Sequence, residues 1–368
     1  MNLTLFLCGD VMLGRGIDQL LPHPGAPHLY EPCVRTALGY VELAEGVAGP
    51  LPRPVDFNYV WGDALEELQR RAPQARIVNL ETSVTAAEDA WPGKGIHYRM
   101  HPRNAPCLAA AGIECCVLAN NHVLDWGYRG LQETLDTLHG AGIRTAGAGR
   151  DAEEAAAPAV MELAGGGRVL VFAYALESSG VPPGWAAASG RAGINFLAEL
   201  SDATCDAVAR QVAAARREGD LVVVSIHWGG NWGYRVSAQE RAFAHRLLDA
   251  GAADVLHGHS SHHPRGIEIY RERLILYGCG DFLNDYEGIG GQESFRPELC
   301  LMVFPTLDAA SGRLQRLALV PMRVRRFRLQ HAVEEEARWL QRTLDRESRT
   351  FGTRVDYASA RELLLRRG

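Results

Sequence analysis

The chain has 368 residues, of which 47% are hydrophobic, so it has enough apolar material for one large core or for two domains. Its 38 Lys and Arg residues stand against 44 Asp and Glu residues, and its nearest approach to a basic run, residues 323–328, alternates with apolar residues. This balance argues against a nucleic-acid-binding protein, because phosphate backbones are bound by concentrated basic surfaces.

The N-terminus and the cysteines bear on the cellular compartment. Residues 1–7 lack the basic segment of a signal peptide, and no apolar run approaches the roughly 20 residues that span a bilayer. The eight cysteines form no Cys-x-x-Cys pair, and Cys8, Cys115 and Cys116 lie in apolar runs typical of strands. We therefore expect a cytoplasmic protein with buried, reduced thiols and no membrane insertion.

Runs of apolar and β-branched residues predict strands along most of the chain. In chain order they cover residues 3–7, 76–80, 114–119, 168–173, 221–226, 254–256, 267–270, 274–277, 299–304 and 314–320. Helical patterns separate several of the earlier strands, with a leucine stripe at 131–138 and a capping box at 237–240. The later strands read as hairpins. The pattern predicts an α/β protein with a mixed sheet or two packed sheets.

Three stretches rich in Gly or Pro interrupt this pattern. Residues 22–54, 177–195 and 285–297 are predicted to be long loops, and aromatic residues lie in or beside the first two. Loops of this length are either functional lids or simple surface insertions, and aromatic side chains over a site would suit a substrate with an apolar side chain. Residues 332 to about 349 are predicted to form a charged amphipathic helix.

Five polar clusters each follow directly on a predicted strand. Because ligands bind beyond the carboxyl ends of strands in open α/β sheets, side chains presented there can converge on one point. Carboxylate, amide and imidazole groups together suit Mn, Fe or Zn, and also Ca or Mg if the histidines bind only through waters. The clusters are Gly9-Asp10, Asn79-Leu80-Glu81, Asn120-Asn121-His122, His227-Trp228-Gly229 and residues 257–263, which include four histidines.

Each cluster also has a structural explanation. Asp10 could form a turn, Asn121 could close an Asx-turn, and a lone histidine such as His227 is more often structural than a ligand. Glu81 is more informative, because a buried carboxylate is costly without a cation or a donor beside it. Not all of His257, His259, His262 and His263 can bind one centre, and the sequence leaves open which do.

As a set, these motifs resemble the CapA family of poly-γ-glutamate capsule synthesis proteins, within the calcineurin-like metallophosphoesterase superfamily. The resemblance runs from about residue 2 to about residue 285 and rests on residues 9–13, 79–82, 118–127, 227–229 and 258–262. It implies a four-layer αββα sandwich with mixed sheets. We expect this domain to cover residues 1–330, with residues 331–368 as a helical extension packed on it.

The resemblance also implies roles for individual residues. Met12 stands where the superfamily has a ligand histidine, and Glu81 where it has an aspartate, so one of two metal positions is expected to be weakened or lost. His122 would be the acid–base residue. The ligand set would be Asp10, Glu81, Asn121, His227, His259 and His262.

We therefore expect a soluble metal-dependent enzyme that acts on a peptide or γ-linked peptide. The favoured reaction is epimerisation at a Cα next to a carboxylate, similar to that of the lasso-peptide epimerases, for which the same fold family looks like the source. His122, supported by Asp125 or Asp10, would exchange protons together with a second histidine, His227, His259 or His262. The alternatives are a dinuclear metal-dependent hydrolase of a phosphoester or amide, and a non-catalytic component of capsule biosynthesis.

Overall fold

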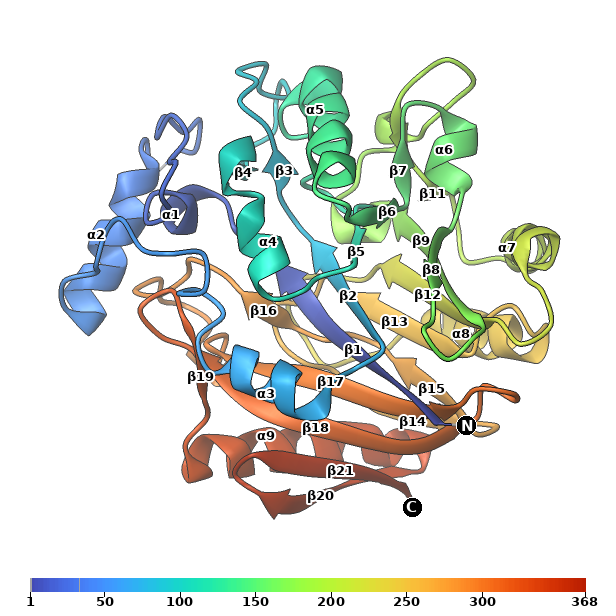
Figure 1. The fold of residues 1–368 in the computed structure, drawn as a ribbon. Helices are drawn as coiled ribbons and strands as arrows, with labels where there is room; N and C mark the ends of the chain where they lie inside the picture. Colours follow the sequence, from blue (N-terminus) through green and yellow to red (C-terminus); the bar gives the residue numbers. More distant parts are fainter. Residues whose placement is uncertain (1, 33) are drawn as a thin grey trace.

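The computed structural model describes residues 2–32 and 34–368, and its core consists of two mixed β-sheets packed face to face (Figure 1). Each of the ten predicted strands overlaps an observed one. The larger sheet runs in the order β20 (Thr353–Ser359), β21 (Glu362–Arg367), β18 (Leu314–Val324), β17 (Leu299–Asp308), β1 (Asn2–Val11), β2 (Ala75–Leu80), β5 (Cys115–Val117) and β6 (Arg144–Ala146), with β16 (Asp281–Leu283) beside β1 and β19 (Leu329–His331) beside β18.

The smaller sheet has seven strands. Their order is β11 (Phe196–Leu197), β9 (Arg168–Leu176), β12 (Leu221–His227), β13 (Val255–His259), β15 (Arg273–Leu276) and β14 (Ile267–Tyr270), with β8 (Ala159–Glu162) beside β9. Two further two-stranded sheets pair β3 (Ser83–Val84) with β4 (Arg99–Met100) and β7 (Ala148–Gly149) with β10 (Gly193–Ile194).

Helices cover the outer face of each sheet, which gives four layers and confirms the expected αββα sandwich (Figure 1). The alternation in β12 shows how the layers are built: Val223 packs into the core between the sheets, while Val222 and Val224 pack under the helices. The helices over the larger sheet are α3 (Ala64–Arg71), α4 (Pro106–Ala110) and α5 (Gly127–Gly140), and those over the smaller sheet are α7 (Asp202–Ala215) and α8 (Ala238–Asp249).

The local signals for α8 are confirmed. Ser237 accepts a hydrogen bond from the Glu240 backbone N–H at 3.0 Å, and the Glu240 carboxylate accepts one from the Ser237 N–H at 2.6 Å. This reciprocal capping box fixes where the helix begins. The buried face of the helix includes Phe243, Leu247 and Leu248, as its spacing predicts.

Two regions differ from the sequence expectations. Residues 22–54 are not loop throughout, because they contain α2 (Ala37–Ala48), which buries Tyr40, Val41 and Ala44. The helical extension expected over 331–368 is present only as α9 (Glu334–Ser348). After it, β20 and β21 form an antiparallel hairpin, and β21 pairs with β18, so these final residues extend the larger sheet.

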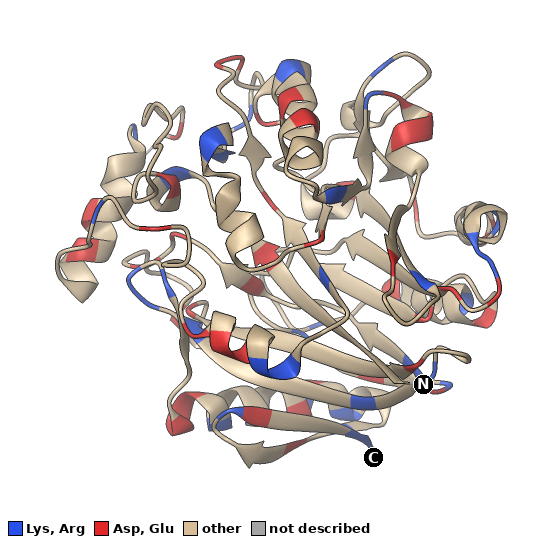
Figure 2. Ribbon diagram, in the orientation of Figure 1, with Lys and Arg blue, Asp and Glu red and all other residues tan. Residues whose placement is uncertain are grey.

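The distribution of charged residues and cysteines can be compared with the sequence expectations. Lys and Arg are interspersed with Asp and Glu over the elements in view (Figure 2). The seven described cysteines are free and buried, and Cys33 lies outside the described residues. Across residues 2–32 and 34–368, every helix is too short or too polar to cross a membrane.

Candidate metal centre

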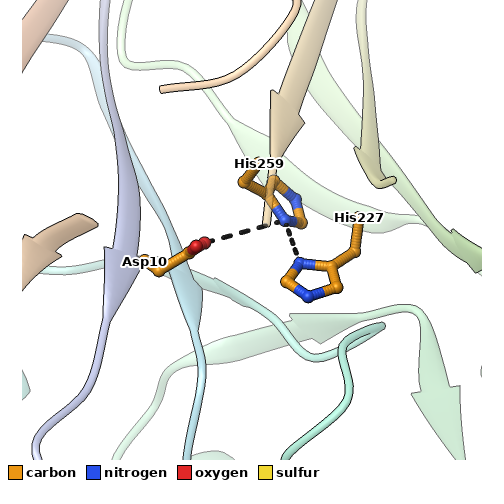
Figure 3. Close-up of side chains that lie close together, drawn as sticks. All are labelled: Asp10, His227 and His259. Carbon is orange, nitrogen blue, oxygen red and sulfur yellow. Dashed lines mark hydrogen bonds and ion pairs between the residues drawn. The ribbon is translucent and has the colours of Figure 1, made fainter. Parts of the chain in front are cut away.

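The site lies where parallel strands of both sheets end. In the larger sheet Asp10 of β1 is in register with Asn79 of β2, and in the smaller sheet His227 of β12 is in register with His259 of β13. Because the two sheets pack face to face, these ends lie opposite one another (Figure 3). Ligand atoms of Asp10, His227 and His259 all lie within 4.8 Å of one another, and all three side chains are buried.

The imidazole nitrogens of His227 and His259 face each other, and a shared proton or a bound cation would stabilise this contact. The Nδ1 atoms of His227 and His259 are 2.7 Å apart, and the Asp10 Oδ1 atom is 3.9 Å from His259 Nδ1. On its other side, His227 Nε2 lies 3.1 Å from the Asn121 side-chain oxygen, and His259 Nε2 lies 2.8 Å from the Ser225 hydroxyl. Two facing nitrogens can share one proton or together bind a cation.

Buried carboxylates supply the matching negative charge. Burial and the neighbouring Asp281 carboxylate raise the pKa of Asp10 to about 7. Burial, Asp10 and Asp281 also raise the pKa of Glu81 well above its usual value, and the Glu81 Oε2 atom has no hydrogen-bond partner among the described residues. A divalent cation would satisfy this orphaned oxygen and favour the ionised form of these carboxylates. The donor set of Asp10, Glu81, Asn121, His227 and His259 therefore fits such an ion.

His122 forms a buried acid–base pair beside this cluster. Its Nδ1 atom lies 2.7 Å from an oxygen of Asp125, whose other oxygen contacts the Lys94 ammonium at 2.6 Å. Its Nε2 atom lies 3.6 Å from Glu81. Burial lowers the pKa of His122 to about 4 despite the Asp125 carboxylate beside it. The imidazole is thus held neutral, with Nε2 directed toward the carboxylates.

A second histidine–carboxylate pair faces the same space. His262 Nδ1 lies 2.8 Å from Asp281 Oδ1, and the other Asp281 oxygen accepts a 2.8 Å hydrogen bond from Asn284. Burial disfavours the charged form of His262, but the Asp281 carboxylate outweighs this effect and raises the pKa of His262 above its usual value. His262 and His122 both line one cavity of about 140 Å³.

Some of the other residues expected from the sequence line the cavity, and two of the histidines do not. Glu81, Asn121 and His227 also line the 140 Å³ cavity. His257 bonds the Cys8 carbonyl at 2.7 Å and lies 3.1 Å from the Ser225 hydroxyl, and His263 lies against the Trp232 ring, so both have structural partners outside the ligand cluster.

Two residues of the site escaped the sequence reading. Asp281 comes shortly after the predicted strand 274–277. It belongs to the motif Cys279-Gly280-Asp281, which repeats Cys8-Gly9-Asp10, and that repeat could have identified it. Lys94 lies in a Gly- and Pro-containing loop with no local pattern that marks it. Met12, where the resemblance has a ligand histidine, lies with its sulfur 3.5 Å from the Tyr286 hydroxyl.

Comparison with known proteins identifies the family. The protein-family model described as "Bacterial capsule synthesis protein PGA_cap" matches residues 4–286. Over 353 residues the chain is 52% identical to the "Probable polyglutamine synthesis accessory protein" of Mycobacterium tuberculosis, which covers 96% of this chain and 93% of the relative. It is 24% identical over 284 residues to the capsule biosynthesis protein CapA of Bacillus anthracis, and 24% identical over 289 residues to the PGA biosynthesis protein CapA of Bacillus subtilis.

These two alignments cover 77% of this chain, and 60% and 63% of the respective relatives. The family match covers the smaller sheet, the strands of the larger sheet up to β16 and all five polar clusters, so the resemblance to CapA proteins is confirmed. The chain belongs to the PGA_cap family of bacterial capsule synthesis proteins.

Proposed function

We propose that this protein is a metal-dependent enzyme of capsule or polyglutamine synthesis that cleaves an amide bond in a peptide or γ-linked peptide. The observation that carries the proposal is the shared cavity: the buried His122, which is paired with Asp125, borders the same 140 Å³ space as Glu81, Asn121 and His227. The names of the relatives refer to polyglutamine, PGA and capsule synthesis, which supports an amide-linked substrate.

Five residues would hold the cation: Asp10, Glu81, Asn121, His227 and His259. A divalent cation bound there would polarise the scissile carbonyl and make a water molecule more acidic. We propose that His262, held by Asp281, also faces this ion or the leaving group rather than bulk solvent.

His122 and His262 would accept and donate the protons of the reaction. Asp125 accepts from Nδ1 of His122, which leaves Nε2 free to take a proton from the attacking water. The water oxygen then bonds to the carbonyl carbon, the carbon–nitrogen bond breaks, and the leaving amine takes a proton from protonated His262. Lys94 keeps Asp125 ionised and in place.

The test is to incubate the protein, loaded separately with Mn²⁺ or Zn²⁺, with a γ-linked pentaglutamate and with an α-linked peptide, and to look for cleavage products by mass spectrometry. We expect products from at least one of these two substrates, and we expect them to disappear with EDTA and in His122→Ala. The control His139→Ala removes an exposed histidine of α5 and retains activity. Absence of products under every loading would contradict cleavage, and substrate binding without turnover would favour a non-catalytic component.

A specific observation favours a second candidate reaction, epimerisation at a Cα. His122 and His262 border one cavity, and each is paired with a carboxylate, Asp125 or Asp281. Inversion at carbon needs a base and a conjugate acid at separate positions. In that case one histidine takes the Cα proton and the other returns a proton to the opposite face. Mass spectrometry of substrate recovered from D₂O distinguishes the two, because epimerisation adds one deuterium per inverted residue and leaves the chain intact.

A further inference from the structure

A second pocket opens directly beside the cavity of the candidate metal centre. It has a volume of about 290 Å³ and shares four lining residues with that cavity: Ile96, Tyr98, His262 and Tyr286. Pockets for whole small molecules begin at about 300 Å³ and extend to about 1,000 Å³. The second pocket is thus suited to one large group of a molecule whose reacting part lies in the cavity.

The walls of this pocket are aromatic and aliphatic. Tyr40, Tyr98 and Trp232 line it, and its rim carries Ile96 and Ile289, which are 44% and 47% exposed. Both isoleucines belong to the small set of large hydrophobic residues that remain exposed in the described structure. Apolar side chains exposed together around a concave surface are typical of a binding site.

The charged groups of the pocket are already paired. The buried Arg15 guanidinium binds Glu31 at 3.0 Å and Asp285 at 2.5 Å, and it lies over the Tyr40 ring at 3.8 Å. His262 is paired with Asp281. A carboxylate entering this pocket would lose water without gaining an unpaired cation, which costs free energy.

The hydroxyl groups are also satisfied. The hydroxyls of Tyr98 and Tyr286 bond each other at 2.7 Å, so they direct ring surface rather than free donors toward the pocket. Apart from the Gln292 side-chain amide, the lining therefore offers apolar surface and little polar recognition.

We propose that this pocket binds the bulky apolar side chain of a substrate residue adjacent to the reacting carbonyl. The inference rests on the proposed function for the position of that carbonyl. It narrows the substrate class to peptides that carry an aromatic or branched aliphatic residue at this position, rather than an uninterrupted run of glutamates. Trp232 and Ile289, which line this pocket and not the cavity, then determine specificity without touching the reacting atoms.

The test is isothermal titration calorimetry in EDTA, which removes any dependence on metal and turnover. The probes are two peptides, Ala-Ala-Phe-Ala and Ala-Ala-Glu-Ala. We expect the phenylalanine peptide to bind at least about 10-fold more tightly, since a single methylene in an apolar pocket already changes binding by about 10- to 200-fold. Ile289→Asp removes this preference, and Trp232→Ala weakens it. The control Val333→Asp, at a residue 48% exposed and outside the pocket, retains it.

Two results would overturn the inference: equal or tighter binding of the glutamate peptide, and no measurable binding of either peptide. These results can be told apart from a failure of the proposed function. Metal-dependent cleavage of glutamyl peptides with no apolar preference would leave the proposed function standing and overturn the pocket assignment alone.

Discussion

Asp10 and Asp281 face each other in register on the parallel strands β1 and β16, and both carboxylates are buried. Two buried carboxylates this close cannot both ionise without compensation, because like charges repel strongly at low dielectric constant. Protons or a cation must therefore accompany the pair. The nearby His227 and His259 nitrogens and the orphaned Glu81 oxygen favour a cation.

This pairing depends on a close approach of two backbones. A Cβ atom added at Gly9 would lie 1.6 Å from the Gly280 carbonyl oxygen. We predict that Gly9→Ala lowers the free energy of unfolding by about 3 kcal/mol or more, since backbone must move to relieve the overlap. The matched control Gly46→Ala, in α2 with open space around it, raises it by about 0.5–1 kcal/mol. Urea unfolding measures both, and similar values for the two variants would contradict the prediction.

Asp125 is expected to control the acid–base residue. Asp125→Asn removes the charge that orients His122 and pairs with Lys94. We predict a fall in kcat of about 100-fold or more with a smaller change in KM, because general base catalysis contributes about 10²–10⁴-fold. Initial rates in the peptide assay provide the measurement. Asp136→Asn, at an aspartate 70% exposed, is the matched control and keeps its rate. An unchanged kcat in Asp125→Asn would rule out this role for the pair.

Asp345 of α9 gives a prediction for the pH dependence of stability. Burial opposes ionisation, but hydrogen bonds from Arg354, the Val355 N–H and Arg349 lower the pKa of Asp345 to about 2. The folded pKa lies below the unfolded value of about 4, so the ionised carboxylate stabilises the fold above pH 4. This contribution is lost as the pH falls from about 4 to about 2.

Asp345→Asn is therefore expected to lower stability at pH 7 by about 1–2 kcal/mol, an amount reduced by the solvent exposure of the partner arginines. The difference from the wild type should shrink between pH 4 and pH 2. Thermal unfolding at several pH values measures it. Asp356→Asn, which removes a surface ion pair with Arg366, serves as the control and changes stability by less than about 0.5 kcal/mol. A difference independent of pH would contradict the prediction.

The strands, the layers and most of the candidate site could be predicted because their signals are local. The apolar run at 221–226 identifies β12. His227 is the first polar residue after this run, so its position at the strand end follows from the run itself. Strands with weaker sequence patterns were not predicted. β20 and β21 lie at the sheet edge, where Val355 and Leu363 are the fully buried hydrophobic residues and charged neighbours blur the alternation.

The remaining features of the site depend on contacts between residues far apart in the sequence, and so they could not be predicted from local patterns. Asp281 enters the site because β16 lies parallel to β1, a contact between distant parts of the chain that no local periodicity reports. The same holds for the choice among the histidines of 257–263. His259 and His262 face the cavity cluster while His257 turns to the Cys8 carbonyl, and this difference depends on the packing of one sheet against the other.

The most direct test of the central claim is the metal content of the purified protein, measured by elemental mass spectrometry after equilibration with Mn²⁺ or Zn²⁺ and removal of free ions. We predict about one divalent ion per chain in the wild type and in the control His139→Ala, and a loss of most of it in Asp10→Ala and His259→Ala. Wild-type protein that retains no ion, or variants that retain as much as the wild type, would contradict the assignment of these residues to a metal centre.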